Sequence, residues 1–225
     1  MEIYKESLEI EEFMVNGDGF DVPILKLTPT KSRGGVIVVH NYGGSKEEML
    51  GLALRIAKTG FTTGVIDLRG HGENNLLMDE KVLLDLETTI TSFKEFGKIT
   101  VVGHSLGGRL ALISSADHAI AISPAISKKF SPKTQEMIRN LRDYRVKRSE
   151  IDLFTIMRDI PQLEHDPENV LIVYGSRDVP EIINGCEQLV TEGYEVVKVD
   201  DALHVDIYTL EPTFEAVINK LQEWY

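Results

Sequence analysis

The sequence has little of what marks a secreted, membrane-spanning or nucleic-acid-binding protein. Its 225 residues contain one cysteine, Cys186, so no disulfide can form within the chain. No apolar run approaches the roughly 20 residues that a membrane-spanning helix needs, and the mixed, acidic start Met1–Glu6 does not resemble a signal peptide. Lysine and arginine number 24 against 36 aspartates and glutamates, and this net charge of −12 disfavours phosphate-rich partners. We therefore expect a cytoplasmic protein with no nucleic-acid and no membrane partner.

Motifs for metals and cofactors are also missing from the sequence. No cluster of histidine, cysteine and carboxylate residues has the spacing of a zinc site, and no glycine-rich loop has the pattern that cradles phosphates. We therefore expect no cofactor and no bound metal. The content of 42% hydrophobic and 27% charged residues is that of an ordinary globular protein. The length favours one domain over residues 1–225, which could be a monomer or a homodimer.

The most informative stretch runs from Ile99 to Leu112. It joins a β-branched apolar run, the turn Gly103-His104-Ser105-Leu106-Gly107-Gly108 and a helical pattern, which is the context of a nucleophile elbow. Glycines two residues before and after Ser105 allow the backbone to close tightly around it. We predict that Ser105 is a nucleophile and that the backbone N–H of Leu106, at the helix start, stabilises an oxyanion. The alternative is a packed strand-to-helix connection without chemistry.

Alternating strand and helix patterns predict an α/β protein with a mostly parallel sheet and right-handed crossovers. Before these patterns, two alternating segments joined by the turn Asn16–Gly19 predict an antiparallel hairpin at the sheet edge, with Pro23 on an edge strand. Ser45 is expected to cap the helix that begins at Lys46. The expected strands are Tyr4–Glu11, Phe20–Leu27, Gly34–His40, Phe61–Leu68, Ile99–His104, His118–Ser123, Val170–Gly175 and Tyr194–Val199.

Residues 124–169 interrupt this alternation and are expected to form a small lid over the strand ends. Short helices are predicted at Lys133–Arg142 and Glu150–Ile160. The segment is the most basic part of an acidic chain. A solvated helix face is the common reason for such charge; the alternatives are steering of an acidic substrate or pairing with the acidic body. Its basic residues are Lys128, Lys129, Lys133, Arg139, Arg142, Arg145, Lys147 and Arg148.

A serine nucleophile needs a general base, which is usually a histidine oriented by a carboxylate. Asp178 follows the strand that ends at Gly175, and His204 follows the strand that ends at Val199. Because the carboxyl ends of parallel strands share one sheet edge, we predict that both residues meet Ser105. Alternatives exist for each role. Asp200, Asp201 and Asp206 crowd His204 in sequence, and His165 could reach the site from the lid; Cys186 is expected in the core and His118 in packing.

Together these pieces resemble the α/β-hydrolase family over nearly the whole chain. The matching motifs are His40-Asn41-Tyr42-Gly43-Gly44, Asp67-Leu68-Arg69-Gly70-His71-Gly72, Gly103-His104-Ser105-Leu106-Gly107-Gly108, Tyr174-Gly175-Ser176-Arg177-Asp178 and Leu203-His204. The resemblance implies an α/β-hydrolase fold with an eight-stranded, mostly parallel sheet, helices on both faces and a small helical lid.

For the site, the resemblance implies Ser105 as nucleophile, Asp178 as orienting acid and His204 as base. It places the second oxyanion N–H on Tyr42, in a loop where Asn41 stands in place of a glycine that many relatives have. His40, His71 and His104 recur in the family's loops and are expected to shape them.

The sequence therefore predicts a cofactor-independent serine hydrolase that cleaves a small-molecule carboxylic ester through an acyl-enzyme, as a carboxylesterase does. Peptidases, thioesterases and lipase-type acyl hydrolases use the same parts on the same scaffold and remain alternatives. A binding protein that keeps the fold without its chemistry is a further alternative.

Overall fold

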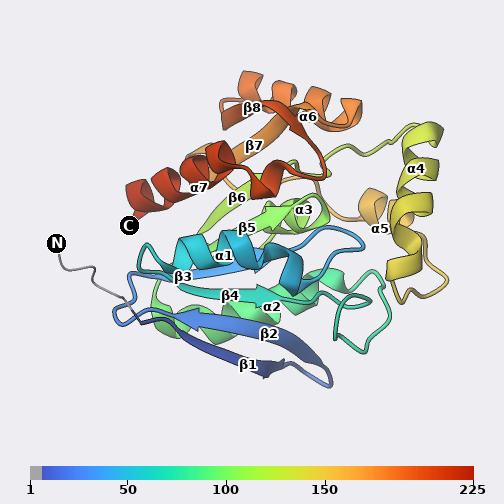
Figure 1. Cartoon of the computed structure of the whole chain (residues 1–225). Coiled ribbons are helices and arrows are strands. Elements are labelled where there is room, and N and C mark those ends of the chain that lie inside the picture. The colour runs from blue at the N-terminus through green and yellow to red at the C-terminus, as the bar shows by residue number, and fades with distance from the viewer. Residues whose placement is uncertain (1–6) are drawn as a thin grey trace.

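A computed structural model describes residues 7–225, so Tyr4–Glu6 of the first expected strand lie outside the described residues. Eight strands form one sheet in the order β1-β2-β4-β3-β5-β6-β7-β8 (Figure 1). β1 and β2 pair antiparallel with each other, and β2 pairs antiparallel with β4; the remaining neighbours are parallel. This confirms the predicted sheet. The strands are β1 Glu9–Asn16, β2 Asp21–Thr28, β3 Gly35–Val39, β4 Thr62–Ile66, β5 Ile99–His104, β6 His118–Ile122, β7 Val170–Arg177 and β8 Glu195–Leu203.

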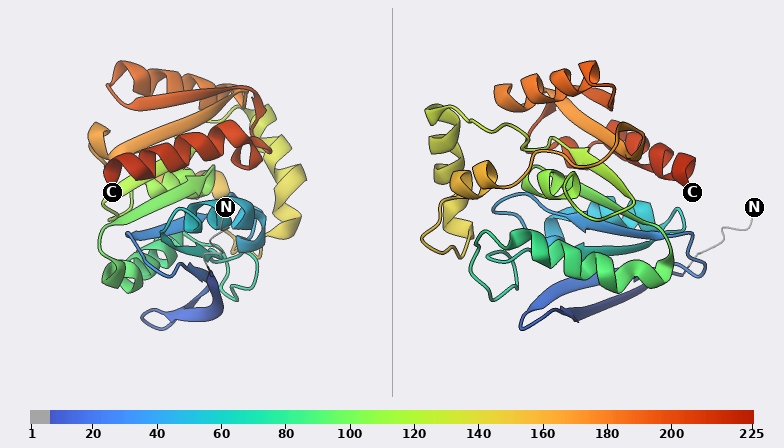
Figure 2. Two further views of the ribbon diagram at one scale, coloured as in Figure 1. Left: turned by 60° about the vertical axis from the view of Figure 1, so that its left-hand side comes forward. Right: turned by 180° about the vertical axis from the view of Figure 1, so that it is seen from behind.

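Helices cover both faces of the sheet, as the two views in Figure 2 show. One apolar core lies between the sheet and α1 and α7, and the other lies between the sheet and α2, α3 and α6. In β3, Val36 and Val38 belong to the first core, whereas Ile37 and Val39 belong to the second. Alternate residues of a strand point to opposite faces, so a strand buried on both faces must be apolar throughout. The helices are α1 Leu50–Ala57, α2 Val82–Phe93, α3 Leu106–Ala111, α4 Pro132–Arg142, α5 Leu153–Asp159, α6 Pro180–Thr191 and α7 Glu211–Trp224.

The N-terminal hairpin forms at the sheet edge, but two of its details differ from the prediction. Its first strand, β1, ends later than expected, because pairing continues to the register Asn16–Asp21 directly before the turn. Pro23 lies in β2, which is an inner strand. It is tolerated there because the ladder between β2 and β4 begins only at Ile24, and the Pro23 carbonyl instead accepts the Asp67 N–H at 3.0 Å.

The expected cap by the Ser45 side chain is wrong. The Ser45 hydroxyl donates to the Glu47 carboxylate at 2.5 Å, and the Lys46 N–H at the start of the helical segment donates to Asp67 Oδ1 at 2.8 Å. A carboxylate after β4 thus satisfies a helix-start donor that local sequence assigned to serine. This bond ties the start of the helical segment before α1 to the end of the neighbouring strand.

The lid, residues 124–169, lies beyond the carboxyl ends of the parallel strands. Figure 1 shows α4 and α5 beside one end of the sheet, away from the C-terminus. Both helices lie close to their expected positions, since α4 spans Pro132–Arg142 and α5 spans Leu153–Asp159. None of the helices within residues 7–225 combines the length and apolar character needed to cross a lipid bilayer.

Candidate active site

Ser105 lies in the sharp turn between β5 and α3, in an unusual backbone conformation with φ of 55° and ψ of −108°. Two glycines make this turn possible. A Cβ on Gly103 would overlap the Gly107 carbonyl, and a Cβ on Gly107 would overlap the Val39 carbonyl of the neighbouring strand. The turn therefore requires glycine at both positions, and it presents the Ser105 side chain at the carboxyl edge of the sheet.

The three predicted site residues meet at this edge. His204 Nε2 lies 3.1 Å from Ser105 Oγ, and His204 Nδ1 lies 2.8 Å from Asp178 Oδ1. The Asp178 side chain is completely buried, whereas 22% of the His204 side chain is exposed. The arrangement is a continuous hydrogen-bonded line from a buried carboxylate through an imidazole to a hydroxyl. In such an arrangement the imidazole can take a proton from the hydroxyl, while the carboxylate keeps the imidazole oriented.

The Asp178 carboxylate is held by more partners than sequence reasoning identified. The buried Ser123 hydroxyl donates to Oδ2, and the Val179 N–H donates to Oδ1 at 2.6 Å. Burial alone would raise the pKa of Asp178, but His204, together with the Ser123 and Val179 bonds, keeps that pKa below its ordinary value. Ser123 follows directly after β6, and this position at the strand end was the available signal for its role.

The other candidates for these roles lie elsewhere. Within residues 7–225, Asp178 is the only carboxylate bonded to His204, so none of Asp200, Asp201 and Asp206 is its partner. Asp206 instead accepts the Leu203 N–H at 2.8 Å. His165, the alternative base, is not among the residues that line the site cavity. Its carbonyl accepts the hydroxyl of Tyr194, which does not line that cavity either. Cys186 is fully buried in the core, as predicted, and burial raises the pKa of its thiol.

The loop histidines support the site without facing Ser105. His104 Nε2 donates to the His204 carbonyl at 2.9 Å, since a carbonyl can only accept. The Leu68 N–H donates to His40 Nε2 at 3.1 Å, and His40 Nδ1 donates to the Asn41 carbonyl at 2.7 Å. Burial lowers the pKa of His40 to about 4. Burial, and then repulsion from His40 when His40 is protonated, lower the pKa of His71 to about 3. These rings are therefore neutral structural donors and acceptors.

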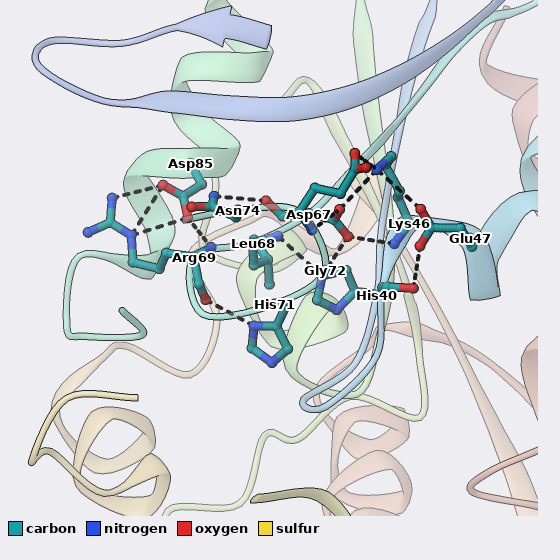
Figure 3. A network of polar contacts seen from close by, with 12 residues as sticks. His40, Lys46, Glu47, Asp67, Leu68, Arg69, His71, Gly72, Asn74 and Asp85 are labelled. Carbon is teal, nitrogen blue, oxygen red and sulfur yellow. Dashed lines mark hydrogen bonds and ion pairs between the residues drawn. The ribbon is translucent and has the colours of Figure 1, made fainter. Parts of the chain in front are cut away.

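A largely buried polar network holds the loops that follow β3 and β4 (Figure 3). Asp67 accepts the backbone N–H groups of Lys46 and Glu73, at 2.8 and 3.0 Å, and it also accepts from the Lys46 ammonium. The Arg69 guanidinium pairs with the buried Asp85 at 2.8 Å, which ties the same loop to α2. Sequence reasoning did not identify this network, because its partners are distant along the chain.

Tyr42, the predicted second oxyanion donor, lies in the loop after β3 and lines the same cavity as Ser105 and Leu106. Within residues 7–225 the backbone N–H groups of Tyr42 and Leu106 donate to no other group. The Asn41 amide donates to the Tyr42 carbonyl at 3.3 Å, and the Tyr42 hydroxyl donates to Asp143 at 2.8 Å. The Asn41 side chain thus holds the Tyr42 backbone through a bond inside the loop, and Asp143 connects the loop to the lid.

A cavity of about 660 Å³ opens at Ser105 and His204 and is covered by the lid. A second hollow of about 630 Å³ lies beside α6 and includes none of the three predicted catalytic side chains. Apolar side chains from α4 and α5 make up much of the wall of the first cavity; they are Met137, Ile138, Leu141, Leu153, Phe154 and Met157. A substrate reaching Ser105 must therefore contact an apolar wall.

The sheet order, the elbow and the lid define the class: this is an α/β hydrolase. Residues 30–182, well over half of the chain, match the family model described as serine aminopeptidase, S33, and the chain belongs to that family of hydrolases. No curated protein matches the sequence significantly.

Solved structures share the fold at low sequence identity. Est1E from Butyrivibrio proteoclasticus bound to ferulic acid is 19% identical with a TM-score of 0.71, covering 94% of this chain and 98% of its own. A soluble variant of monoglyceride lipase from Saccharomyces cerevisiae is 17% identical with a TM-score of 0.69, covering 100% and 96%. A predicted CIB-like hydrolase from Thermoplasma acidophilum is 16% identical with a TM-score of 0.66, covering 96% and 100%. At these identities the likeness establishes the fold alone.

Proposed function

We propose that the protein is a serine hydrolase that cleaves carboxylic esters of small molecules through an acyl-enzyme. The observation that carries the proposal is the unbroken line of hydrogen bonds from Asp178 through His204 to Ser105. Ser105 serves as nucleophile, His204 as general base and acid, and Asp178 as the group that orients the imidazole and stabilises its charged form.

The reaction proceeds in two halves. Ser105 Oγ attacks the ester carbonyl while His204 Nε2 takes its proton, and the backbone N–H groups of Leu106 and Tyr42 donate to the resulting oxyanion. Collapse of this intermediate breaks the bond to the alcohol, which leaves with the proton from His204. A water molecule then gives a proton to His204 and attacks the acyl-serine ester. The second collapse releases the carboxylic acid and restores Ser105.

The family name raises an aminopeptidase as second candidate, and the charges in the cavity argue against it. An aminopeptidase must bind the free ammonium group of its substrate, which calls for an available carboxylate. The carboxylates that line the cavity are Asp178 and Glu181. Asp178 is occupied by His204 and Ser123, and Glu181 accepts the Ser131 N–H at 2.8 Å and the Thr134 hydroxyl at 3.1 Å. We therefore expect esters to be cleaved much faster than aminoacyl amides.

Covalent labelling tests the proposal directly. A fluorophosphonate probe should label the native protein, and peptide mass spectrometry should find the adduct on Ser105. Ser105→Ala and His204→Ala should abolish the labelling and the hydrolysis of para-nitrophenyl butyrate. Ser127→Ala is the matched control, since Ser127 lies beside the second hollow and should stay fully labelled at position 105.

Three results would contradict the proposal. Absence of any adduct on Ser105 would favour a binding protein that keeps the fold. Activity retained in His204→Ala would assign the base to another histidine, and faster cleavage of aminoacyl amides than of esters would favour the aminopeptidase.

A further inference from the structure

One arginine of the lid differs from its neighbours in having no partner. Arg139 pairs with Asp152, Arg145 with Glu48, Arg148 with Asp143 and Arg158 with Asp159, at distances from 2.6 to 3.3 Å. Arg142 makes no ion pair and no side-chain hydrogen bond within residues 7–225. Four of the five lid arginines thus have a carboxylate partner, three within the lid and one in the body, and Arg142 is the one left out.

Arg142 is placed at the site. It is the last residue of α4, is half-buried, and lines the cavity together with Ser105 and His204. Its stem packs on the loop after β3 so closely that a Cβ on Gly43 would lie 3.0 Å from Arg142 Cβ and 3.1 Å from Arg142 Cδ. The side chain is therefore held beside the proposed oxyanion loop, with its stem against backbone.

The Arg142 charge also reaches His104, whose ring lies next to His204, and Tyr208, whose ring lies next to His104. Burial is the main reason that the pKa of His104 is lowered and that of Tyr208 is raised, and the positive charge of Arg142 adds to the first shift and opposes the second. The His104 ring lies 5.0 Å from the His204 ring and 4.7 Å from the Tyr208 ring. The guanidinium thus acts on the His104 ring beside the proposed base and on the Tyr208 ring that lies against His104.

A half-buried guanidinium without a counter-charge is unfavourable, because it loses solvent contacts and gains no carboxylate in exchange. In a chain with 36 acidic residues, the other lid arginines found such partners. The carboxylates of the cavity, Asp178 and Glu181, are already bonded to other groups. Two exposed cations, Lys133 and Arg177, also line the cavity, so the mouth is basic although the protein is acidic.

We propose that Arg142 binds a carboxylate of the substrate, so that the preferred substrates are esters that carry a second, ionised carboxyl group. The planar fork of N–H donors on arginine fits a carboxylate in two parallel hydrogen bonds. The apolar wall of α4 and α5 accommodates the carbon chain, and Arg142 fixes its charged end beside the oxyanion loop. This inference rests on the proposed esterase function, and it makes Arg142 a specificity-determining residue.

Matched ester pairs test the inference, with one pair for each half of the substrate. For the acyl half, para-nitrophenyl hydrogen adipate is compared with its neutral methyl ester. For the alcohol half, para-carboxyphenyl butyrate is compared with the corresponding methyl benzoate. In the native protein we expect kcat/KM for the acidic member to exceed that for the neutral member in one pair. Arg142→Gln should lower this ratio about tenfold or more, as expected for loss of a charged hydrogen bond.

Controls separate charge recognition from structural damage. Arg142→Lys should restore part of the ratio, since the charge returns without the fork. Arg145→Gln removes a paired lid arginine that does not line the cavity, and it should leave the ratio unchanged. The native ratio should fall with added salt, whereas the ratio in Arg142→Gln should not. Thermal unfolding of each variant verifies that the fold is kept.

An unchanged ratio in Arg142→Gln, or a native protein that prefers the neutral member of both pairs, would overturn the inference. Both outcomes leave hydrolysis of neutral esters and Ser105 labelling intact. Failure of the proposed function itself would look different, because no ester would be cleaved and Ser105 would not be labelled.

Discussion

At the scale of single residues, Asp178 is the group on which the proposed proton transfer depends. Its carboxylate is completely buried and bonded to His204 Nδ1 at 2.8 Å. Asp178→Asn keeps the size of the side chain but removes the charge that stabilises an imidazolium. We expect kcat for para-nitrophenyl butyrate to fall about 10⁴-fold, with the folded structure retained.

Asp200→Asn is the matched control for this substitution. Asp200 is exposed and precedes His204 by a few residues, so its loss should change kcat by less than about twofold. Steady-state kinetics of both variants, with circular dichroism to verify folding, decides the assignment. Full activity of Asp178→Asn combined with inactivity of Asp200→Asn would transfer the orienting role to the residues next to His204.

At the scale of secondary-structure elements, α3 presents Ser105 and also anchors the lid. Arg109 of α3 is fully buried and donates to carbonyl groups at the two ends of the lid's helical region: Ala125, Ile126, Met157, Ile160 and Pro161. Burial lowers the pKa of Arg109 to about 10, so the guanidinium stays charged at neutral pH. A single side chain therefore joins the nucleophile helix to the segment that covers the cavity.

We predict that Arg109→Lys lowers the free energy of unfolding by about 3 kcal/mol or more, because an ammonium cannot reach all of these carbonyls and several stay buried without a donor. Urea unfolding followed by tryptophan fluorescence measures the change. Arg158→Lys in α5 is the control; its side chain is 63% exposed, and we expect a change within about 0.5 kcal/mol. Equal stability of the two variants would contradict the anchoring role.

The lid is also tied to the loop after β3 through one hydrogen bond. The Tyr42 hydroxyl donates to Asp143 at 2.8 Å, and Asp143 in turn pairs with Arg148. Since the Tyr42 N–H is the proposed second oxyanion donor, Tyr42→Phe should loosen this loop while retaining the N–H. We expect a fall in kcat of about three- to tenfold, the equivalent of one ordinary hydrogen bond.

Tyr144→Phe is the control for this prediction, because Tyr144 belongs to the same segment and is 81% exposed. It should leave kcat unchanged. A double-mutant cycle of Tyr42→Phe with Asp143→Asn should show non-additive effects. Additive effects, or equal losses in the two tyrosine variants, would mean that the lid does not position the loop.

At the scale of the whole molecule, buried neutral histidines make stability depend on pH. Burial lowers the pKa of His40 to about 4, and burial with the His40 charge lowers that of His71 to about 3. Between these values and the ordinary histidine pKa near 6.5, the unfolded chain binds protons that the folded chain does not. The contribution of these neutral histidines to the free energy of unfolding is therefore fully present above pH 6.5, and it decreases as the pH falls below that value.

We expect the free energy of unfolding to fall by about 2 kcal/mol per histidine between pH 7.5 and pH 5. Urea unfolding at several pH values measures this slope. His71→Gln removes one of the titrating groups, so the drop between the two pH values should become smaller whatever the absolute stability of the variant. A native protein equally stable at pH 5 and pH 7.5 would contradict the prediction.

The sheet and the three proposed catalytic positions could be predicted from the sequence, because each depends on local patterns. The apolar runs of β3 and β5 identify strands buried on both faces, and the spacing of Gly103, Ser105 and Gly107 identifies a turn that excludes larger side chains. The fold class then follows from the alternation of strand and helix, and it brings the carboxyl ends of the strands to one edge. For this reason Asp178 and His204 could be expected near Ser105.

Only the tertiary structure decided which polar groups find a partner. The cap expected from Ser45 was wrong because Asp67, distant in sequence, reaches the same N–H. The Arg109 anchor and the unpaired Arg142 were equally invisible, since a hydrogen bond or ion pair between distant segments leaves no periodic pattern in the sequence. Ser123 had only its position directly after β6 as a signal. Hydrophobic burial follows local patterns, whereas the pairing of buried charges depends on distances that exist only once the chain has folded.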